Sequence, residues 1–176
     1  AEPQLKESLS KGKKDPDTVQ YFLGQLSEAK NNEEEAIAYY REVKDGEYQF
    51  SAQVRIAYLL GKRGQLEEAR RILHQAKATG EQQRVQVTLI EAQILREADQ
   101  FAESYNVLQQ GLAKMPDNTD LIYGAAMMAD KTGKPDVFEK LMRKLILIKP
   151  DHAHAYNALG YSFLERNERI PEAMQL

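Results

Sequence analysis

The residues of this sequence with the most evident capacity for chemistry are two histidines near its C-terminal end. His152 and His154 follow Asp151, and imidazole and carboxylate side chains together can bind a transition metal. The histidines are only two residues apart, however, and side chains at that spacing point in different directions on a helix. The triplet is therefore interpreted as the first turn of a helix, and no metal site is expected.

Two other charged clusters also have structural explanations. Glu33, Glu34 and Glu35 could bind a cation, but three carboxylates also suit the positive end of a helix dipole. The basic run from Lys11 to Lys14 could contact phosphate, but it fits a solvated helix C-terminus. The sequence carries no nucleophile–base signature, glycine-rich phosphate loop or paired-carboxylate motif. We therefore expect no enzyme activity, no catalytic residues and no cofactor.

The composition sets broad limits on the fold and the partners. The chain has 176 residues, which is enough to bury a substantial core. Its formal net charge is -3 with both signs interspersed, which argues against an electrostatic nucleic-acid binder. It has no cysteine, so disulfides and thiolate chemistry are excluded. No apolar run approaches the roughly 20 residues that a transmembrane helix needs.

A repeat determines how these residues are positioned. Small residues recur at steps of 33, 35, 34 and 34 residues, at Gly24, Ala57, Ala92, Ala126 and Gly160. A second series has the same steps and consists of residue types that tolerate the left-handed conformation of a helix end. Its members are Asn31, Gly64, Asp99, Gly133 and Asn167. Two residue classes in one register predict a tandem array of helix pairs, each with a tight turn inside it.

The last repeat carries the most recognisable motif. Tyr156 and Phe163 flank the pair Leu159–Gly160, ten residues after Pro150. An aromatic, leucine–glycine and an aromatic, preceded by a closing proline, resemble the first helix of a tetratricopeptide repeat. The matching positions elsewhere are Leu23–Gly24 and Ile56–Ala57 in first helices, and Ala36, Ala69 and Ala173 in second helices.

The resemblance covers nearly the whole chain and implies an all-α fold. Tetratricopeptide repeats form a right-handed superhelical solenoid of antiparallel helix pairs. We expect a single domain over 1–176 with about five repeats, as a fragment of a longer solenoid. The expected segments are 1–16, the tail helix of an earlier repeat, and repeats at about 17–49, 50–84, 85–118, 119–152 and a truncated 153–176.

Several features depart from the regular pattern: the first two units lack a closing proline, Glu91 before Ala92 is polar, and two further departures bear on packing. Phe138 stands where the family has alanine, and we expect its ring to be buried against the small residues at positions 124–126. The incomplete last repeat is expected to expose an apolar strip that includes Leu159, Phe163 and Leu164. Such a strip predicts self-association through the C-terminal repeat, or fraying of its helices.

The family places its first helices on the concave face, which implies a binding surface there. The expected partner-binding residues are Tyr21, Gln25, Arg55, Tyr58, Leu89, Gln93, Tyr123, Met127, Asn157 and Tyr161. Tyrosine combines a large contact area with a polar hydroxyl, which suits recognition of a peptide. We therefore predict a protein–protein interaction scaffold that binds a protein or peptide partner, and no nucleic acid. Because Arg55 is the only basic residue in this set, the basic carboxylate clamp of some relatives is not expected.

Other interpretations remain open. The tyrosines could be packing residues, in which case the chain is a structural spacer or self-association module of a larger multi-repeat protein. RNA binding by related helical-pair repeats is a third class, which the acidic balance disfavours. The overall sequence pattern is most similar to that of bacterial proteins with many tetratricopeptide repeats, which are often exported lipoproteins. That resemblance implies the periplasm or outer membrane as one possible location, and the residues themselves indicate no compartment.

Overall fold

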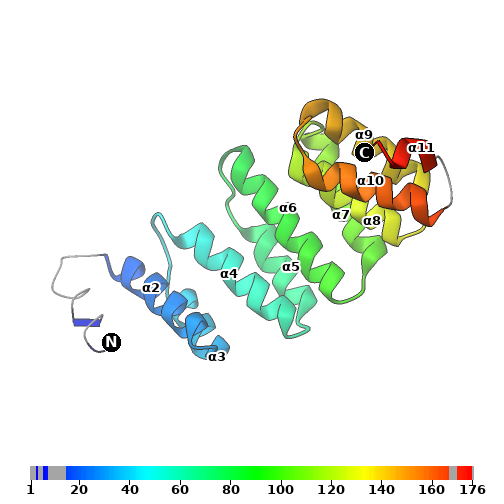
Figure 1. Cartoon of the computed structure of the whole chain (residues 1–176). Coiled ribbons are helices and arrows are strands. Elements are labelled where there is room, and N and C mark those ends of the chain that lie inside the picture. The colour runs from blue at the N-terminus through cyan, green and yellow to red at the C-terminus, as the bar shows by residue number, and fades with distance from the viewer. Residues whose placement is uncertain (1–2, 4–5, 8–14, 167–169, 176) are drawn as a thin grey trace. The chain divides into compact units, whose positions relative to one another are not determined.

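The computed structural model describes residue 3 and residues 6–7, 15–166 and 170–175, and all regular elements in these ranges are helices (Figure 1). The chain divides into two compact units, Ala1–Ile94 and Leu95–Leu176. The first contains α2 (Pro16–Ala29), α3 (Glu33–Arg41), α4 (Gln49–Lys62), α5 (Leu66–Gln75) and most of α6 (Gly80–Glu97). The second contains α7 (Phe101–Lys114), α8 (Thr119–Lys131), α9 (Pro135–Ile148), α10 (Ala153–Glu165) and α11 (Ile170–Ala173). Most of the predicted tail helix at 1–16 lies outside the described residues.

The predicted turn positions are confirmed wherever the structure describes them. Asn31 and Asp99 have φ 59°, Gly64 has φ 81° and Gly133 has φ 72°. The amide of the residue after each turn donates to a carbonyl five residues earlier, as in Lys134 N to Ala129 O at 2.8 Å. This bond satisfies a carbonyl that the helix end would otherwise leave unpaired. The fifth predicted turn residue, Asn167, lies outside the described residues.

Side chains also define helix starts. His152 precedes α10, and its Nδ1 accepts a hydrogen bond from the Ala155 amide at 3.2 Å, which confirms the interpretation as a helix start. Asn118 caps α8 in the same way, through its Oδ1 and the Leu121 amide at 3.1 Å. These bonds pair amide groups that have no partner within the helix.

In the first unit, helices approach closely where a side chain is missing. A Cβ atom added at Gly24 would lie 2.5 Å from Cε1 of Tyr40, whose side chain is 1% exposed. A Cβ atom added at Gly61 would lie 2.5 Å from Ile94, which is also buried. Gly24 is the small residue of the predicted repeat pattern, so the pattern marks the site where α2 and α3 pack directly.

In the second unit, α8 packs against both α7 and α9. Phe138 is buried, as predicted, and so are Ala125 and Ala126. Gly124, however, faces a different neighbour from the expected one, because an added Cβ atom would lie 3.2 Å from Cδ2 of Leu108. The glycine therefore makes room for α7, since it faces a leucine of that helix.

The expectation for the C-terminal repeat was partly wrong. Leu159 and Phe163 are buried, because α10 packs against both α9 and the short α11. Leu164 is 51% exposed, as expected. Met174 on the chain after α11 is 82% exposed as well.

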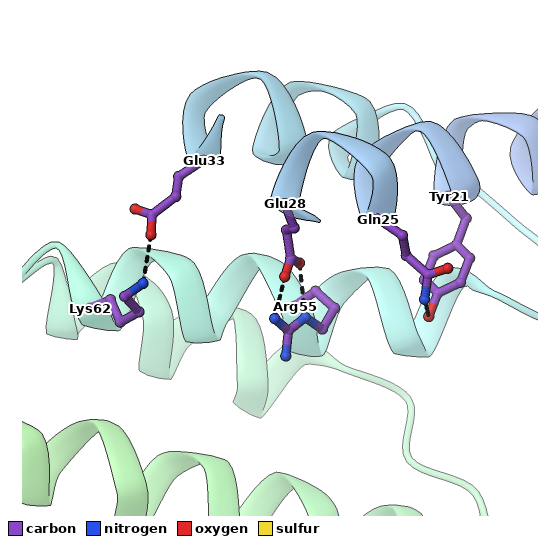
Figure 2. A network of polar contacts seen from close by, with 6 residues as sticks. All are labelled: Tyr21, Gln25, Glu28, Glu33, Arg55 and Lys62. Atoms are coloured by element: carbon purple, nitrogen blue, oxygen red, sulfur yellow. Dashed lines mark hydrogen bonds and ion pairs between the residues drawn. The ribbon is translucent and has the colours of Figure 1, made fainter. Parts of the chain in front are cut away.

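Ion pairs join consecutive helix pairs in the first unit. The Lys62 Nζ lies 2.6 Å from Glu33 Oε1 (Figure 2), and Arg63 Nη2 lies 2.9 Å from Glu34 Oε1. The third carboxylate of this run, Glu35, accepts a hydrogen bond from Ser27 Oγ at 3.1 Å. The three acidic residues thus stand at the start of α3, as predicted, and two of them also bind cations of α4 and its C-cap.

Candidate functional site

Tyr21 belongs to a cluster of aromatic rings contributed by α2, α3 and Tyr48, the residue before α4. Its ring stacks on Tyr48 with centroids 4.6 Å apart, and it lies 5.7 Å from the Tyr40 ring. Its hydroxyl accepts a hydrogen bond from Gln25 Nε2 at 3.1 Å (Figure 2). Tyr21 is half-buried and Gln25 is exposed. Tyr21 therefore has a packing role, while its hydroxyl end and Gln25 face the surface.

Arg55 is held by a carboxylate from the preceding helix pair. Its Nε donates to Glu28 Oε1 at 2.9 Å, and its Nη2 donates to the second oxygen of the same carboxylate (Figure 2). The guanidinium also lies 4.9 Å from the centre of the Tyr58 ring, a cation–π contact. Arg55 and Tyr58 are both half-buried, and Tyr58 packs against the core of this unit. Arg55 is thus fixed in position and its charge is neutralised.

The pKa values of this pair reflect the contact. Burial alone would raise the pKa of Glu28, but the hydrogen bond from Arg55, the Tyr40 hydroxyl and the positive charges of Arg55 and Lys62 together outweigh burial, and the pKa lies below its ordinary value. The same hydrogen bond raises the pKa of Arg55. Both groups are therefore ionised near neutral pH, and together they contribute no net charge to this face.

The remaining predicted residues of the first unit lie on α6. Leu89 and Gln93 are both half-buried, so each keeps part of its side chain in contact with solvent. Their neighbour Ile90 packs against the core of the unit. The predicted residues of this unit thus lie on α2, α4 and the second half of α6.

The second unit carries the other four predicted residues on α8 and α10. The Tyr123 ring lies 5.5 Å from the His152 ring, and both Tyr123 and Met127 are half-buried. Asn157 is exposed, and Tyr161 is 64% exposed. A hydrogen bond between Tyr161 and Glu165 raises the pKa of the phenol, so its hydroxyl stays protonated near neutral pH.

The sequence pattern did not reveal the buried carboxylate among the described residues of the first unit. Glu91 is 5% exposed; its Oε1 lies 2.7 Å from Arg70 Nε and 3.0 Å from His74 Nε2. The only signal was a polar residue at a position that the repeat keeps apolar, directly before Ala92. The His74 side chain is 58% exposed, and its ring nitrogen nevertheless lies within hydrogen-bond distance of this carboxylate.

Among the residues that the structure describes, neither a metal-binding cluster nor a membrane-spanning helix is found. Within the described ranges, no group of three or more His, Cys, Asp or Glu side chains could hold a metal ion. No helix in the described part of the chain is both long and apolar enough to cross a bilayer.

The paired helices and their regular turns define an all-α solenoid. Solenoids of this kind are a class of protein–protein interaction scaffold. Sequence models of the tetratricopeptide repeat match residues 18–45 and 95–160, together more than half of the chain. The chain belongs to the tetratricopeptide-repeat family, which confirms the predicted family and fold class. This family and fold are those of interaction modules without enzymatic activity.

Relatives agree with this assignment. A TPR repeat-containing protein of Pseudomonas aeruginosa is 34% identical over 160 residues, which are 91% of this chain and 27% of the length of that protein. MamA from Desulfovibrio magneticus RS-1 has the same fold, with a TM-score of 0.66 at 15% identity over 92% of this chain and 91% of its own. YrrB, described as a TPR protein with an unusual peptide-binding site, gives a TM-score of 0.60 at 15% identity over 97% and 87% of the two chains.

Proposed function

We propose that the chain binds a peptide segment of a protein partner along the exposed faces of its first helices. This proposal is carried by one observation. None of the ten predicted residues is buried, whereas the residues on the opposite face of the same helices are buried. On α10, for example, Tyr161 is 64% exposed and Leu159 and Phe163 are at most 1% exposed. The first helices therefore bury one face in the core and present amphipathic side chains on the other face.

The chemistry of these faces favours a neutral, amphipathic peptide. The charge of Arg55 is already matched by Glu28, so this position offers no free cation to an anionic ligand. Amide side chains at Gln25, Gln93 and Asn157 can donate and accept hydrogen bonds along a peptide backbone. The tyrosine rings supply apolar contact area with few rotatable bonds. The likeness to YrrB, a protein described by its peptide-binding site, supports this class of ligand.

The test uses the second unit, where Tyr161 is 64% exposed and Tyr123 is half-buried. A peptide array on the purified chain yields ligands, and fluorescence polarisation then measures their dissociation constants, expected at about 1–100 μM. The double variant Tyr123→Ala, Tyr161→Ala should weaken binding at least about tenfold, because a truncated anchor typically costs 1–2 kcal/mol or more. Peptides bound at the first unit would escape this variant, so Gln25→Ala is measured beside it.

A matched control is Tyr105→Ala. Tyr105 is also a half-buried tyrosine, but it lies on the second helix α7, where Lys134 Nζ is 4.9 Å from the centre of its ring. This variant should leave peptide affinity unchanged. If the first-helix variants bind every selected peptide like the wild-type chain while remaining folded, the binding face is wrong and the spacer interpretation becomes the better one.

A further inference from the structure

A second concave site lies on the first unit, lined by α3, α4, α5 and the segment after α3 rather than by the proposed peptide face. Its cavity volume is about 470 Å³. Three cations line it: Arg41, Lys44 and Arg71. Val43 and Ile72 also line it; Val43 is only 6% exposed and Ile72 is half-buried, so Ile72 supplies most of their apolar surface. The Lys44 Nζ donates to the Arg41 carbonyl oxygen at 2.6 Å, which keeps that charge at the end of α3.

The cations of this pocket already hold one carboxylate of the chain itself. Arg41 Nη2 lies 3.2 Å from Glu68 Oε1, and Arg71 Nη2 lies 4.0 Å from the same atom. All three side chains are well exposed, at 53%, 58% and 39% for Arg41, Arg71 and Glu68. Exposed ion pairs of this kind contribute little net stability. An external carboxylate could therefore replace Glu68 at little cost to folding.

The charges of the lining do not balance. Two arginines and one lysine face a single glutamate, so the pocket keeps an excess of positive charge in a chain whose overall charge is negative. Guanidinium groups match the geometry of carboxylates better than that of a diffuse anion. Apolar side chains beside cations suit a ligand that carries an aliphatic group next to its acid.

We propose that this pocket binds an acidic segment of a partner protein, in which an aspartate or glutamate lies beside a leucine-like side chain. The carboxylate would take the place of Glu68 beside Arg41 and Arg71, and the aliphatic group would lie against the half-buried Ile72. This site differs from the proposed peptide face in both position and charge. It would allow one unit to contact a partner at two places.

The probe is a fluorescein-labelled peptide of sequence Leu-Asp-Glu-Leu-Asp-Leu, capped at its C-terminus, with a matched Asn/Gln analogue. Fluorescence polarisation at low salt should show binding of the acidic peptide and at least about tenfold weaker binding of the analogue. Arg41→Gln with Arg71→Gln should weaken the acidic peptide by a similar factor. Glu68→Gln should strengthen it about threefold or more, because it removes the internal competitor.

The control is Arg63→Gln, which removes another exposed arginine with a glutamate partner, Glu34, outside the pocket. It should change the affinity less than about twofold. Thermal melts of each variant establish that the chain is folded. Equal losses in Arg63→Gln and the Arg41/Arg71 variant, no gain in Glu68→Gln, or equal binding of a short single-stranded RNA would overturn the proposal. The variant Tyr123→Ala, Tyr161→Ala should bind the acidic peptide normally, so failure of one site is distinguishable from failure of the other.

Discussion

Gly24→Ala adds one methyl group where α2 and α3 are in direct contact. The new Cβ atom would lie 2.5, 2.6 and 2.9 Å from Cε1, Cδ1 and Cζ of Tyr40. The Tyr40 ring is 1% exposed and lies 5.7 Å from the Tyr21 ring, so it has little room to turn away. Relief of these close contacts must therefore shift the backbone of α2 or α3, or disturb the aromatic cluster.

The expected cost follows from two opposing effects. Overpacking of a dense core typically costs about 1–3 kcal/mol, and three close contacts with a rigid ring place this case at or above the upper end. Replacing glycine by alanine within a helix returns up to about 1 kcal/mol. We expect a net loss of about 2 kcal/mol in the free energy of unfolding.

Urea unfolding followed by circular dichroism measures this loss. The control is Gly124→Ala, where the added Cβ atom would lie 3.2 Å from a terminal methyl carbon of Leu108, a contact that a small shift relieves. That variant should remain within about 0.5 kcal/mol of the wild-type chain. Gly24→Ala combined with Tyr40→Leu should show a favourable coupling energy, because the ring atoms that collide are absent. A Gly24→Ala variant as stable as wild type would refute the steric argument.

Three further predictions concern other contacts. Phe138→Ala should cost about 3–5 kcal/mol in urea unfolding, because Phe138 is 2% exposed and its ring leaves a cavity; a loss under about 1 kcal/mol would contradict that burial. Arg55→Gln should cost about 1 kcal/mol at pH 7, a modest value because the Arg55 side chain is 37% exposed. The pKa of Glu28 is lowered in the folded chain. The stabilisation by Arg55 is therefore present when the pH is above 4.5, the ordinary pKa of Glu28, and it is lost as the pH falls through the lowered pKa. If the difference in unfolding free energy between wild type and variant is the same at pH 3 as at pH 7, this assignment is contradicted. Leu164→Lys should reduce concentration-dependent association in sedimentation velocity, because Leu164 and Met174 are exposed apolar side chains; a strictly monomeric wild-type chain would disprove self-association.

The turns were predictable because their requirements are local. A left-handed residue costs little at glycine, asparagine or aspartate, and a residue type alone therefore marks the position. Asn31, Gly64, Asp99 and Gly133 confirm this, and the helices that flank them follow from the repeat period. Leu23–Gly24 likewise indicates close packing, because no side chain larger than hydrogen fits against Tyr40.

Contacts between repeats were not predictable in the same way. The period places Arg55 on the first helix of its pair, but it does not show that Glu28, 27 residues earlier, holds the guanidinium. Gly124 was expected opposite Phe138 and instead faces Leu108, because the pattern reports the size of a residue and not the direction of its neighbour. Which charges pair, and in which direction a side chain points, depend on how one helix pair packs against the next. A pattern within a single repeat does not encode that packing.

The ion pairs of the first unit have a consequence for how such arrays evolve. Arg55 and Lys62 supply the cations for Glu28 and Glu33. A shift back by 33 residues, the interval from Gly24 to Ala57, replaces these two cations with Phe22 and Ala29. A duplicated first helix pair stacked on its original would therefore leave both carboxylates without their partners. The two ion pairs therefore favour the present order of the first two helix pairs over a duplicated one, by the modest amount that partly exposed pairs contribute.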